Sequence, residues 1–412
     1  MMKSESSPID HGWFEPEYLD ERWIELETEL ADVSYELTQL YRKLNKIEES
    51  EKVDFRTVVE GLGKLGRELG KREYGNEVEI EDGPTRDLIF DLGVKMGFIK
   101  REIIKPAEGS VTERLKISSE FPEEAEVAEA VVVPGAAGIS NLRRVAHAMK
   151  GIGSGKIVTD RLILVAGERP VGKTAEPGVM PEYEKPLEVG FRSGDSEYEL
   201  MKLAVEDLLE EEVEGRGAIE WRTETKEVEF GGQKYPFEVL EAEVEIDGKK
   251  IKTQIVNAPY DPQRVLPGGE GKLATRSTTE ETFQATLEVL GDFDPSKKLY
   301  LVSHDMWQIA QLEVAREIFG EKAGREVVGT GPANYEPEGG RKYEEVGKNE
   351  AGETRLRLVG FDSGKTYSGV LADVTKYLDR MTRTEKRVEK RIGDLDAGLK
   401  GKIEQNLRGE EV

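Results

Sequence analysis

The feature that most constrains the fold is the stretch of residues 129–150, where a short apolar run leads through small residues into an amphipathic helix. Residues 130–133 are one alanine and three valines, a composition typical of a parallel strand buried on both faces. The turn Pro134-Gly135-Ala136-Ala137-Gly138 follows, and Ser140 is the expected N-cap of the helix. Apolar side chains then recur at helical spacing, at Leu142, Val145, Ala146 and Met149.

A strand, a small-residue turn and a helix N-terminus favour phosphate and nucleotide binding, because free N–H groups and the helix dipole point at one place. The turn is not a complete G-x-G-x-x-G, so an ordinary strand-to-helix connection is the alternative interpretation. Two more buried-type strands, residues 161–167 and 298–303, also end in small or polar residues. We therefore predict an α/β fold with a Rossmann-like, mostly parallel sheet and helices on both of its faces.

Capping boxes mark the start of two further helices, at Ser196 with Glu199 and at Thr278 with Glu281. Residues 215–258 change to period-2 alternation with turns at Gly231-Gly232 and Asp247-Gly248, which predicts an antiparallel β-hairpin insertion. The insertion either covers a site or is a solvated decoration. Farther along we expect a helix ending at Phe319, a short strand within 325–332, a polar loop over 333–352 and a strand at 355–361.

Heptad-like apolar seams predict long helices at both ends of the chain, over about 16–51 and 370–407. Each seam needs a partner, which is the other helix, the helix's own domain, or a second chain in a coiled-coil homodimer. The expected division of the chain is a helical N-terminal region over 1–128, a Rossmann-like domain over 129–369 and a C-terminal helix over 370–412.

Composition narrows the classes of function. The formal net charge of −25 argues against binding of nucleic acid or an anionic membrane through the whole surface. The chain has no cysteine, and no stretch approaches the ~20 apolar residues of a membrane span. No His/Cys/Asp cluster has metal-ligand spacing, so we expect no metal site. Together these features lead us to expect a cytoplasmic protein with a small-molecule ligand.

Taken in order, the motifs VVVPGAAG, LILVAG-E, a helix containing Glu199, S-T-T-E-E-T and LYLVS-H-D resemble the YdcF/SanA/ElyC-like family, the group with domain of unknown function 218. The likeness covers about residues 129–330. The resemblance implies a Rossmann-like fold that binds S-adenosylmethionine or a nucleotide. Trp307 and Ala310 stand where the family has a His and an Arg. The candidate cofactor-binding residues are Gly135, Ala136, Gly138, Asn141, Gly167, Glu168, Thr279, Glu281 and Ser303.

Three residues are candidates for catalysis. His304 follows a buried strand, where ligands bind in open α/β sheets, and a neutral imidazole there can do acid–base work. Asp305 is either a ligand for a ribose hydroxyl or an N-cap, and Glu199 has a capping-box explanation that needs no ligand. Three hypotheses follow: a transferase or hydrolase acting on a phosphorylated or sugar-nucleotide substrate, a non-catalytic ligand-binding module, and a scaffold that assembles through its terminal helices.

Overall fold

The computed structural model describes residues 30–48, 50–70, 80–105, 117–118, 121–136, 139–167, 196–212, 219–264, 277–291, 294, 297–304, 308–321, 323–334, 341–350, 352–362, 364 and 366–380. The chain divides into two compact units. Gly97–Thr366 form an α/β unit, and Met1–Met96 with Tyr367–Val412 form a helical unit. Each unit is described by itself.

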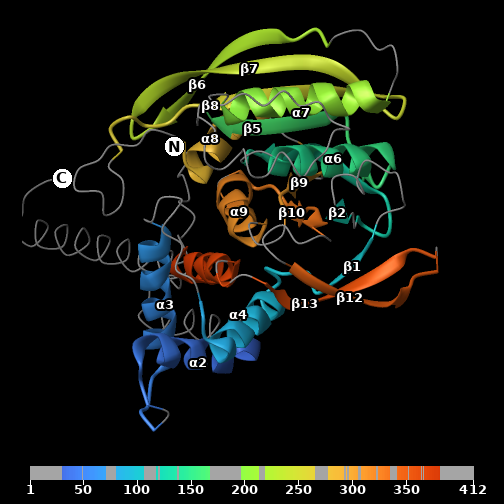
Figure 1. The fold of residues 1–412 in the computed structure, drawn as a ribbon. Helices are drawn as coiled ribbons and strands as arrows, with labels where there is room; N and C mark the ends of the chain where they lie inside the picture. Colours follow the sequence, from blue (N-terminus) through green and yellow to red (C-terminus); the bar gives the residue numbers. More distant parts are fainter. Residues whose placement is uncertain are drawn as a thin grey trace, which may run out of the picture. The chain divides into compact units, whose positions relative to one another are not determined.

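An eight-stranded, mostly parallel sheet is the centre of the α/β unit (Figure 1). Its parallel strands lie in the order β10 (Val327–Thr330), β9 (Lys298–Val302), β3 (Glu126–Pro134), β5 (Arg161–Gly167) and β8 (Lys249–Ala258). Along the sequence, β3 is the first of these five strands and lies in the middle of them. The strands β5 and β8 follow on one side of β3, and β9 and β10 then follow on the other side. This is the doubly wound order of a Rossmann-like fold, with its topological switch between β3 and β9, and the predicted fold class is confirmed in this respect.

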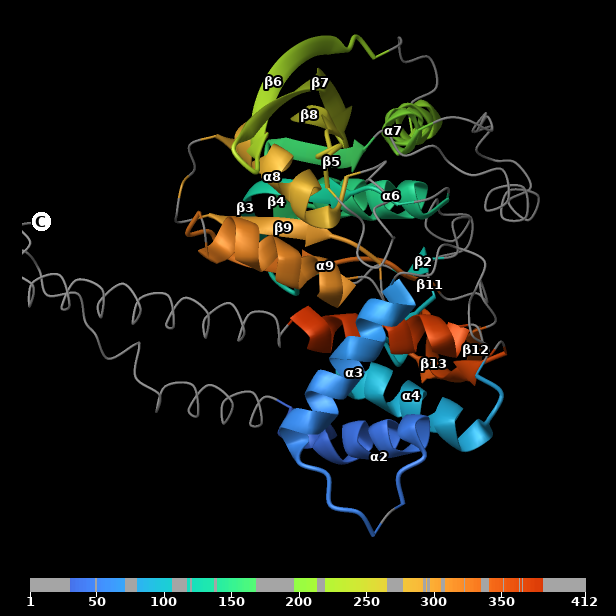
Figure 2. The ribbon, with the colours of Figure 1, turned by 90° about the vertical axis from the view of Figure 1, so that its left-hand side faces the viewer.

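Two helices cover each face of this sheet (Figure 2). Helices α6 (Ile139–Gly153) and α7 (Glu197–Glu212) lie on one face, and α8 (Thr279–Leu290) and α9 (Gln308–Ala315) lie on the other. Alternate residues of β3 serve the two layers: Val131 and Val133 pack with α6, whereas Ala130 and Val132 pack with α8 and α9. All four side chains are fully buried, which explains the unbroken apolar run, because a strand covered on both sides has no polar face.

The predicted β insertion is right for both of its hairpins, but its last strand also belongs to the main sheet. Strands β6 (Arg222–Phe230) and β7 (Gln233–Ile246) pair antiparallel, as expected, and arch over α8. Strand β8, however, pairs antiparallel with β7 and parallel with β5, so it belongs to the main sheet. Its first residues alternate like an exposed hairpin strand, while Thr253–Val256 are buried on both faces. Because β8 begins with polar, exposed residues, its sequence does not indicate that the strand also pairs with β5 inside the main sheet.

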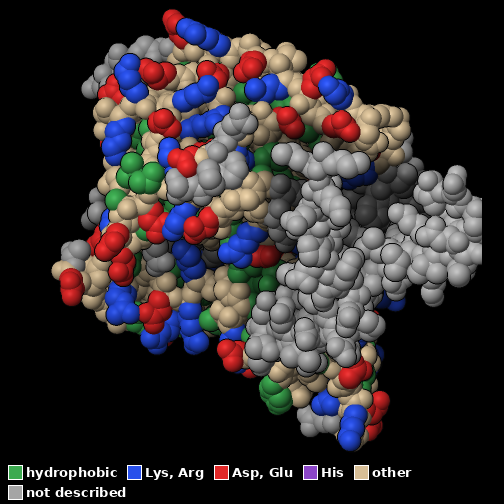
Figure 3. Space-filling view, turned by 180° about the vertical axis from the view of Figure 1, so that it is seen from behind, with side chains coloured by type: hydrophobic (Ala, Val, Ile, Leu, Met, Phe, Trp, Pro, Cys, Tyr) green, Lys and Arg blue, Asp and Glu red, His purple; other side chains and the backbone are tan. Residues whose placement is uncertain are grey.

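Charged side chains on the exposed strands are largely matched across neighbouring strands. Lys250 lies 2.7 Å from Glu243, and Lys252 lies 2.7 Å from Glu241. Acidic and basic side chains are accordingly interspersed in the upper part of Figure 3. Exposed pairs of this kind contribute little to stability, but they leave no large region of one sign in that part of the surface.

A smaller antiparallel sheet corrects the predicted loop over 333–352. Strand β13 (Thr354–Phe361), which was expected, pairs with β12 (Arg341–Lys348) and with β1 (Glu102–Ile104). The two-residue strands β11 (Ala333–Asn334) and β2 (Ile117–Ser118) form another pair. Most of β12 is exposed or half-buried, so its polar sequence carries no apolar alternation, and its pairing rests on backbone hydrogen bonds.

The helical unit contains α2 (Ser34–Asn45), α3 (Phe55–Gly70), α4 (Gly83–Lys95) and a helix over residues 366–380. The expected helix over 16–51 is wrong at its C-terminal end. Lys46 takes a left-handed conformation (φ 56°), and its N–H bonds back to carbonyls of the last turn, which ends α2. Residues 31–33 form a 3-10 turn, while 16–29 and 381–407 lie outside the described residues.

The glycines of α3 permit a close helix contact. A Cβ atom built at Gly66 would lie 2.4 Å from the backbone of Thr375, and one built at Gly63 would lie 2.9 Å from the Cα of Asp379. The helix over 366–380 thus packs against α3 backbone to backbone. The expected pairing of the helices over 18–50 and 370–407 stays a prediction. Within the described residues, no helix is long and apolar enough to cross a membrane.

Candidate functional site

The carboxyl ends of β3 and β9 lie at the topological switch of the sheet, the point at which open α/β sheets form a ligand-binding crevice. The helix after β3 crosses one face of the sheet, and the helix after β9 crosses the other, so the two connections diverge at this point. The residues at the crevice are the turn at 134–136, the first turns of α6, and Ser303 with His304. Most of the sequence-predicted cofactor residues on β3 and β9 are therefore brought to one place.

The turn after β3 is held by Asn141. The backbone N–H of Ala136 donates to the Oδ1 of Asn141 at 2.6 Å, which also fixes the orientation of the amide, because the opposite orientation would set two donors against each other. Asn141 is fully buried, and its Nδ2 has no hydrogen-bond partner within the described part of the chain. A buried donor left unpaired costs about 1–3 kcal/mol, so this one calls for an acceptor that the described part of the chain does not supply.

Arg144 ties the turn to the end of β9. Its Nη1 donates to the carbonyl oxygens of Pro134 at 2.6 Å and Gly135 at 3.1 Å, and its Nε donates to the Nδ1 of His304 at 2.9 Å. Two of the turn's carbonyl oxygens are thereby occupied by a guanidinium. An anion at the crevice would otherwise be repelled by those oxygens, so Arg144 makes the turn more favourable to negative charge.

His304 is held as a neutral donor. Since Nδ1 accepts from Arg144, the imidazole proton lies on Nε2. Burial lowers the pKa of His304 well below its usual value, and the charges of Arg144, Arg143 and Arg341 lower it further. At neutral pH the ring therefore offers an N–H donor. It offers no free basic nitrogen, which changes the expected acid–base role of this histidine into that of a hydrogen-bond donor.

Two consecutive arginines at the start of α6 are the unusual electrostatic feature of the crevice. Arg143 and Arg144 are each only 2% exposed, although the N-terminal end of a helix disfavours positive charge. Arg341, at the start of β12, is also buried and acts on His304. The positive charges of these three arginines act on His304 and so favour negative charge at this end of the sheet.

Ser303 has a structural role. Its side chain is fully buried, and its Oγ donates to the Oε1 of Gln311 at 2.6 Å. Its backbone N–H donates to the carbonyl oxygen of Thr330, and Gly331 lies so close that a Cβ there would overlap the Ser303 carbonyl. His147 is buried beside this contact, with Nε2 3.1 Å from the Thr330 Oγ1. These contacts fix the end of β9, from which His304 extends.

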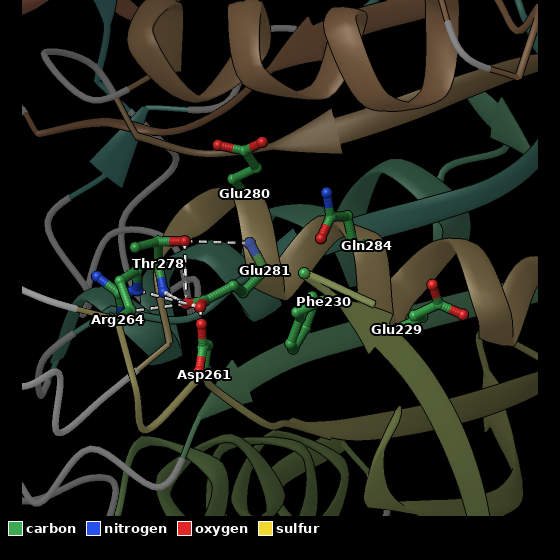
Figure 4. Close-up of a pocket in the computed structure, with 9 residues that line it drawn as sticks. Glu229, Phe230, Asp261, Arg264, Thr278, Glu280, Glu281 and Gln284 are labelled. Atoms are coloured by element: carbon green, nitrogen blue, oxygen red, sulfur yellow. Dashed lines mark hydrogen bonds and ion pairs between the residues drawn. The ribbon is translucent and has the colours of Figure 1, made fainter. Parts of the chain in front are cut away.

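A second group of predicted residues lies at the start of α8 (Figure 4). Thr278 caps the helix, and Glu281 completes the capping box. Glu281 also accepts two hydrogen bonds from Arg264 at 3.1 Å and one from the backbone of Asp261 at 3.1 Å. These side chains border a pocket of about 310 Å³ that Phe230 and Gln284 also line. All of these hydrogen bonds to Glu281 come from other groups of the protein. We therefore interpret Glu281 as a structural anchor for the loop after β8.

The remaining predicted residues lie on other elements. Gly167 ends β5 and lies against Ser277, just before Thr279 opens α8. Glu199 completes the capping box of α7, where its Oε2 accepts from the N–H of Ser196 at 2.7 Å. Gly138, Glu168 and Asp305 lie outside the described residues.

Arg143 and Arg144 were missed by sequence analysis. Charged residues at a helix start usually face solvent, and the apolar spacing of α6 gave no indication that both are buried. The available signal was their position: two arginines directly after a small-residue turn, where an acidic residue is the usual choice.

Among the residues that the structure describes, no group of three His, Cys, Asp or Glu side chains is arranged to hold a metal ion. Comparisons with known proteins do not extend these observations. No family model matches the chain, and neither a curated protein nor a solved structure does.

Proposed function

We propose that this chain binds a small-molecule ligand, a nucleotide or S-adenosylmethionine, in the crevice between the ends of β3 and β9. The observation that carries the proposal is the buried Nδ2 of Asn141 at the topological switch, a donor for which the described residues offer no acceptor. Open α/β sheets bind ligands at this point because the diverging connections leave room and helix N–H groups face it. The motif resemblance to the YdcF-like family supports the same ligand classes.

A transferase or hydrolase acting on a phosphorylated or sugar-nucleotide substrate is the enzymatic form of this proposal. In it, His304 stabilises developing negative charge by donating from Nε2, and Arg144 keeps the ring in that state. A non-catalytic ligand-binding protein is the second candidate. It is favoured by the same hydrogen bond, because the described part of the crevice contains no free general base once Nδ1 of His304 is occupied.

A ligand screen of the full chain by thermal shift tests the proposal. A ligand that binds the native state alone raises the melting temperature by mass action, by an amount that grows with the ratio of its concentration to Kd. We expect stabilisation by a nucleotide or by S-adenosylmethionine. The absence of any shift with ATP, ADP, a sugar nucleotide and S-adenosylmethionine at millimolar concentration would count against the proposal.

Asn141 is a cleaner site for a control variant than Gly135. A Cβ at Gly135 would lie 3.0 Å from the Cβ of Ala166, so a larger residue there perturbs the contact of β3 with β5 as well as the turn. Asn141→Asp keeps an oxygen for the Ala136 N–H and replaces only the unpaired donor. Asn45→Asp, on the exposed end of α2, is the matched control for the added charge.

A further inference from the structure

We infer that the crevice recognises a phosphoryl group, held between the Nδ2 of Asn141 and the Nε2 of His304, and that Arg144 positions both donors. This inference rests on the proposed ligand site and names the chemical group bound there. It selects phosphorylated ligands over S-adenosylmethionine.

The first donor is defined by the turn. The Oδ1 of Asn141 accepts from the N–H of Ala136. Because Oδ1 and Nδ2 belong to the same amide group, Nδ2 also lies beside the turn. The atom is buried and unpaired within the described residues. A ligand group that meets it must be an acceptor, because a donor there would leave two N–H groups facing each other in a site with little water.

The second donor is defined by Arg144. The guanidinium Nε occupies Nδ1 of His304, so only Nε2 carries a proton that the ring can donate. The same guanidinium reaches the carbonyl oxygens of Pro134 and Gly135, directly before Ala136. One side chain therefore connects the turn that presents Asn141 with the strand end that presents His304, and the two donors belong to one cluster.

The charge around His304 favours a phosphoryl group over S-adenosylmethionine. The positive charges of Arg144, Arg143 and Arg341 all act on His304, whose imidazole stays neutral, so the electrostatic potential at this ring favours negative charge. S-adenosylmethionine offers a carboxylate but also brings a sulfonium and an ammonium, which buried arginines repel. A phosphoryl group has only acceptor oxygens, carries up to two negative charges, and can accept from donors that arrive from different strand ends.

Calorimetric titration of the full chain tests the inference, with pyrophosphate, ADP, adenosine and S-adenosylmethionine as separate probes. We expect pyrophosphate and ADP to bind, adenosine to bind at least about tenfold more weakly, and Asn141→Asp to weaken both phosphorylated probes by about tenfold or more, the effect of losing one charge-assisted hydrogen bond. Asn45→Asp should change neither affinity. Binding of S-adenosylmethionine or adenosine without binding of pyrophosphate would overturn the phosphoryl assignment and leave the proposed site intact.

Failure of all four probes to bind would overturn both the inference and the proposed function. A measurement on the unaltered protein keeps the test decisive if Asn141→Asp does not fold. The imidazole ¹⁵N spectrum of the full chain should show His304 protonated at Nε2, and this signal should move when pyrophosphate is added. A His304 signal that is unchanged by saturating pyrophosphate would contradict the assignment.

Discussion

The Nε of Arg144 lies 2.9 Å from the Nδ1 of His304, which joins helix α6 to the end of strand β9, although the two residues are 160 positions apart in the sequence. The contact crosses the topological switch of the sheet. It sets the tautomer of the histidine and the direction of its remaining proton, so the chemistry offered at the crevice depends on a side chain that needs no contact with a ligand.

Replacing Arg144 should release His304. In Arg144→Met, Nδ1 loses its donor and a nearby positive charge, so the pKa of His304 should rise toward its usual value and the ring should populate both neutral tautomers. The imidazole ¹⁵N shifts measured against pH report both changes. Arg144→Lys should restore part of the depressed pKa through its charge. A single Nε2–H tautomer in Arg144→Met would contradict this account.

The Glu281 carboxylate should matter for stability. Glu281→Gln weakens the bidentate pair with Arg264 and the reciprocal cap on Thr278, and we expect the free energy of unfolding to fall by about 1–3 kcal/mol. Urea unfolding measures the change. Glu280→Gln is the matched control on the same helical turn, since Glu280 is only half-buried and should change stability little. Equal effects of the two substitutions would refute the anchoring role.

Helix contact through glycine should make Gly66 sensitive to a single methyl group. Gly66→Ala places a Cβ 2.4 Å from the Thr375 backbone and should destabilise the helical unit by about 1–3 kcal/mol, although alanine normally stabilises a helix interior. Gly83→Ala is the control, because a Cβ there meets nothing within 4 Å. Thermal unfolding of both variants checks the sign; a stabilised Gly66→Ala would mean that the helices are farther apart.

Asp373 should make stability depend on pH. Both carboxylate oxygens are buried without a hydrogen bond within the described residues, and Lys376 lies 3.8 Å away; burial raises the pKa to about 7. The folded pKa exceeds the unfolded value of about 3.9, so the favourable contribution is complete below pH ~4 and is lost as pH rises through ~7.

Asp373→Asn removes this ionisation. The variant should be more stable than the unaltered chain at pH 8, by up to about 4 kcal/mol, the equivalent of a shift of about three pKa units, and the difference should shrink toward pH 4. Asp91→Asn, at an exposed position of α4, is the matched control for removal of a carboxylate. Melting curves over pH 4–8 measure the difference, and a stability gap that does not vary with pH would argue against a buried, ionising Asp373.

The central strands and their helices could be predicted because local sequence and burial agree there. The valines of β3 and the capping box of Thr278 with Glu281 each carry a signal that depends on a few neighbouring residues. The parallel pairing of β8 with β5 and the whole of strand β12 could not be predicted, since β8 begins with exposed lysines and β12 is polar along its length. Their place in a sheet is decided by partners distant in sequence.

The candidate site shows the same division. Gly135, Ala136, Asn141, Ser303 and His304 were identified from the ends of strands and do meet at the switch point. The burial of Arg143 and Arg144, and the bond from Arg144 to His304, depend on packing between segments 160 residues apart. Capping also explains Glu199 and Glu281 without a ligand, which the capping-box spacing had already indicated.

The most direct test of the central claim is an experimental structure of the full chain determined with pyrophosphate. The account predicts an anion at the ends of β3 and β9, within hydrogen-bond distance of the Asn141 Nδ2 and the His304 Nε2, with Arg144 still bonded to Nδ1. A structure in which the Asn141 amide donates to a protein carbonyl, and pyrophosphate at saturating concentration is bound elsewhere or not at all, would contradict it.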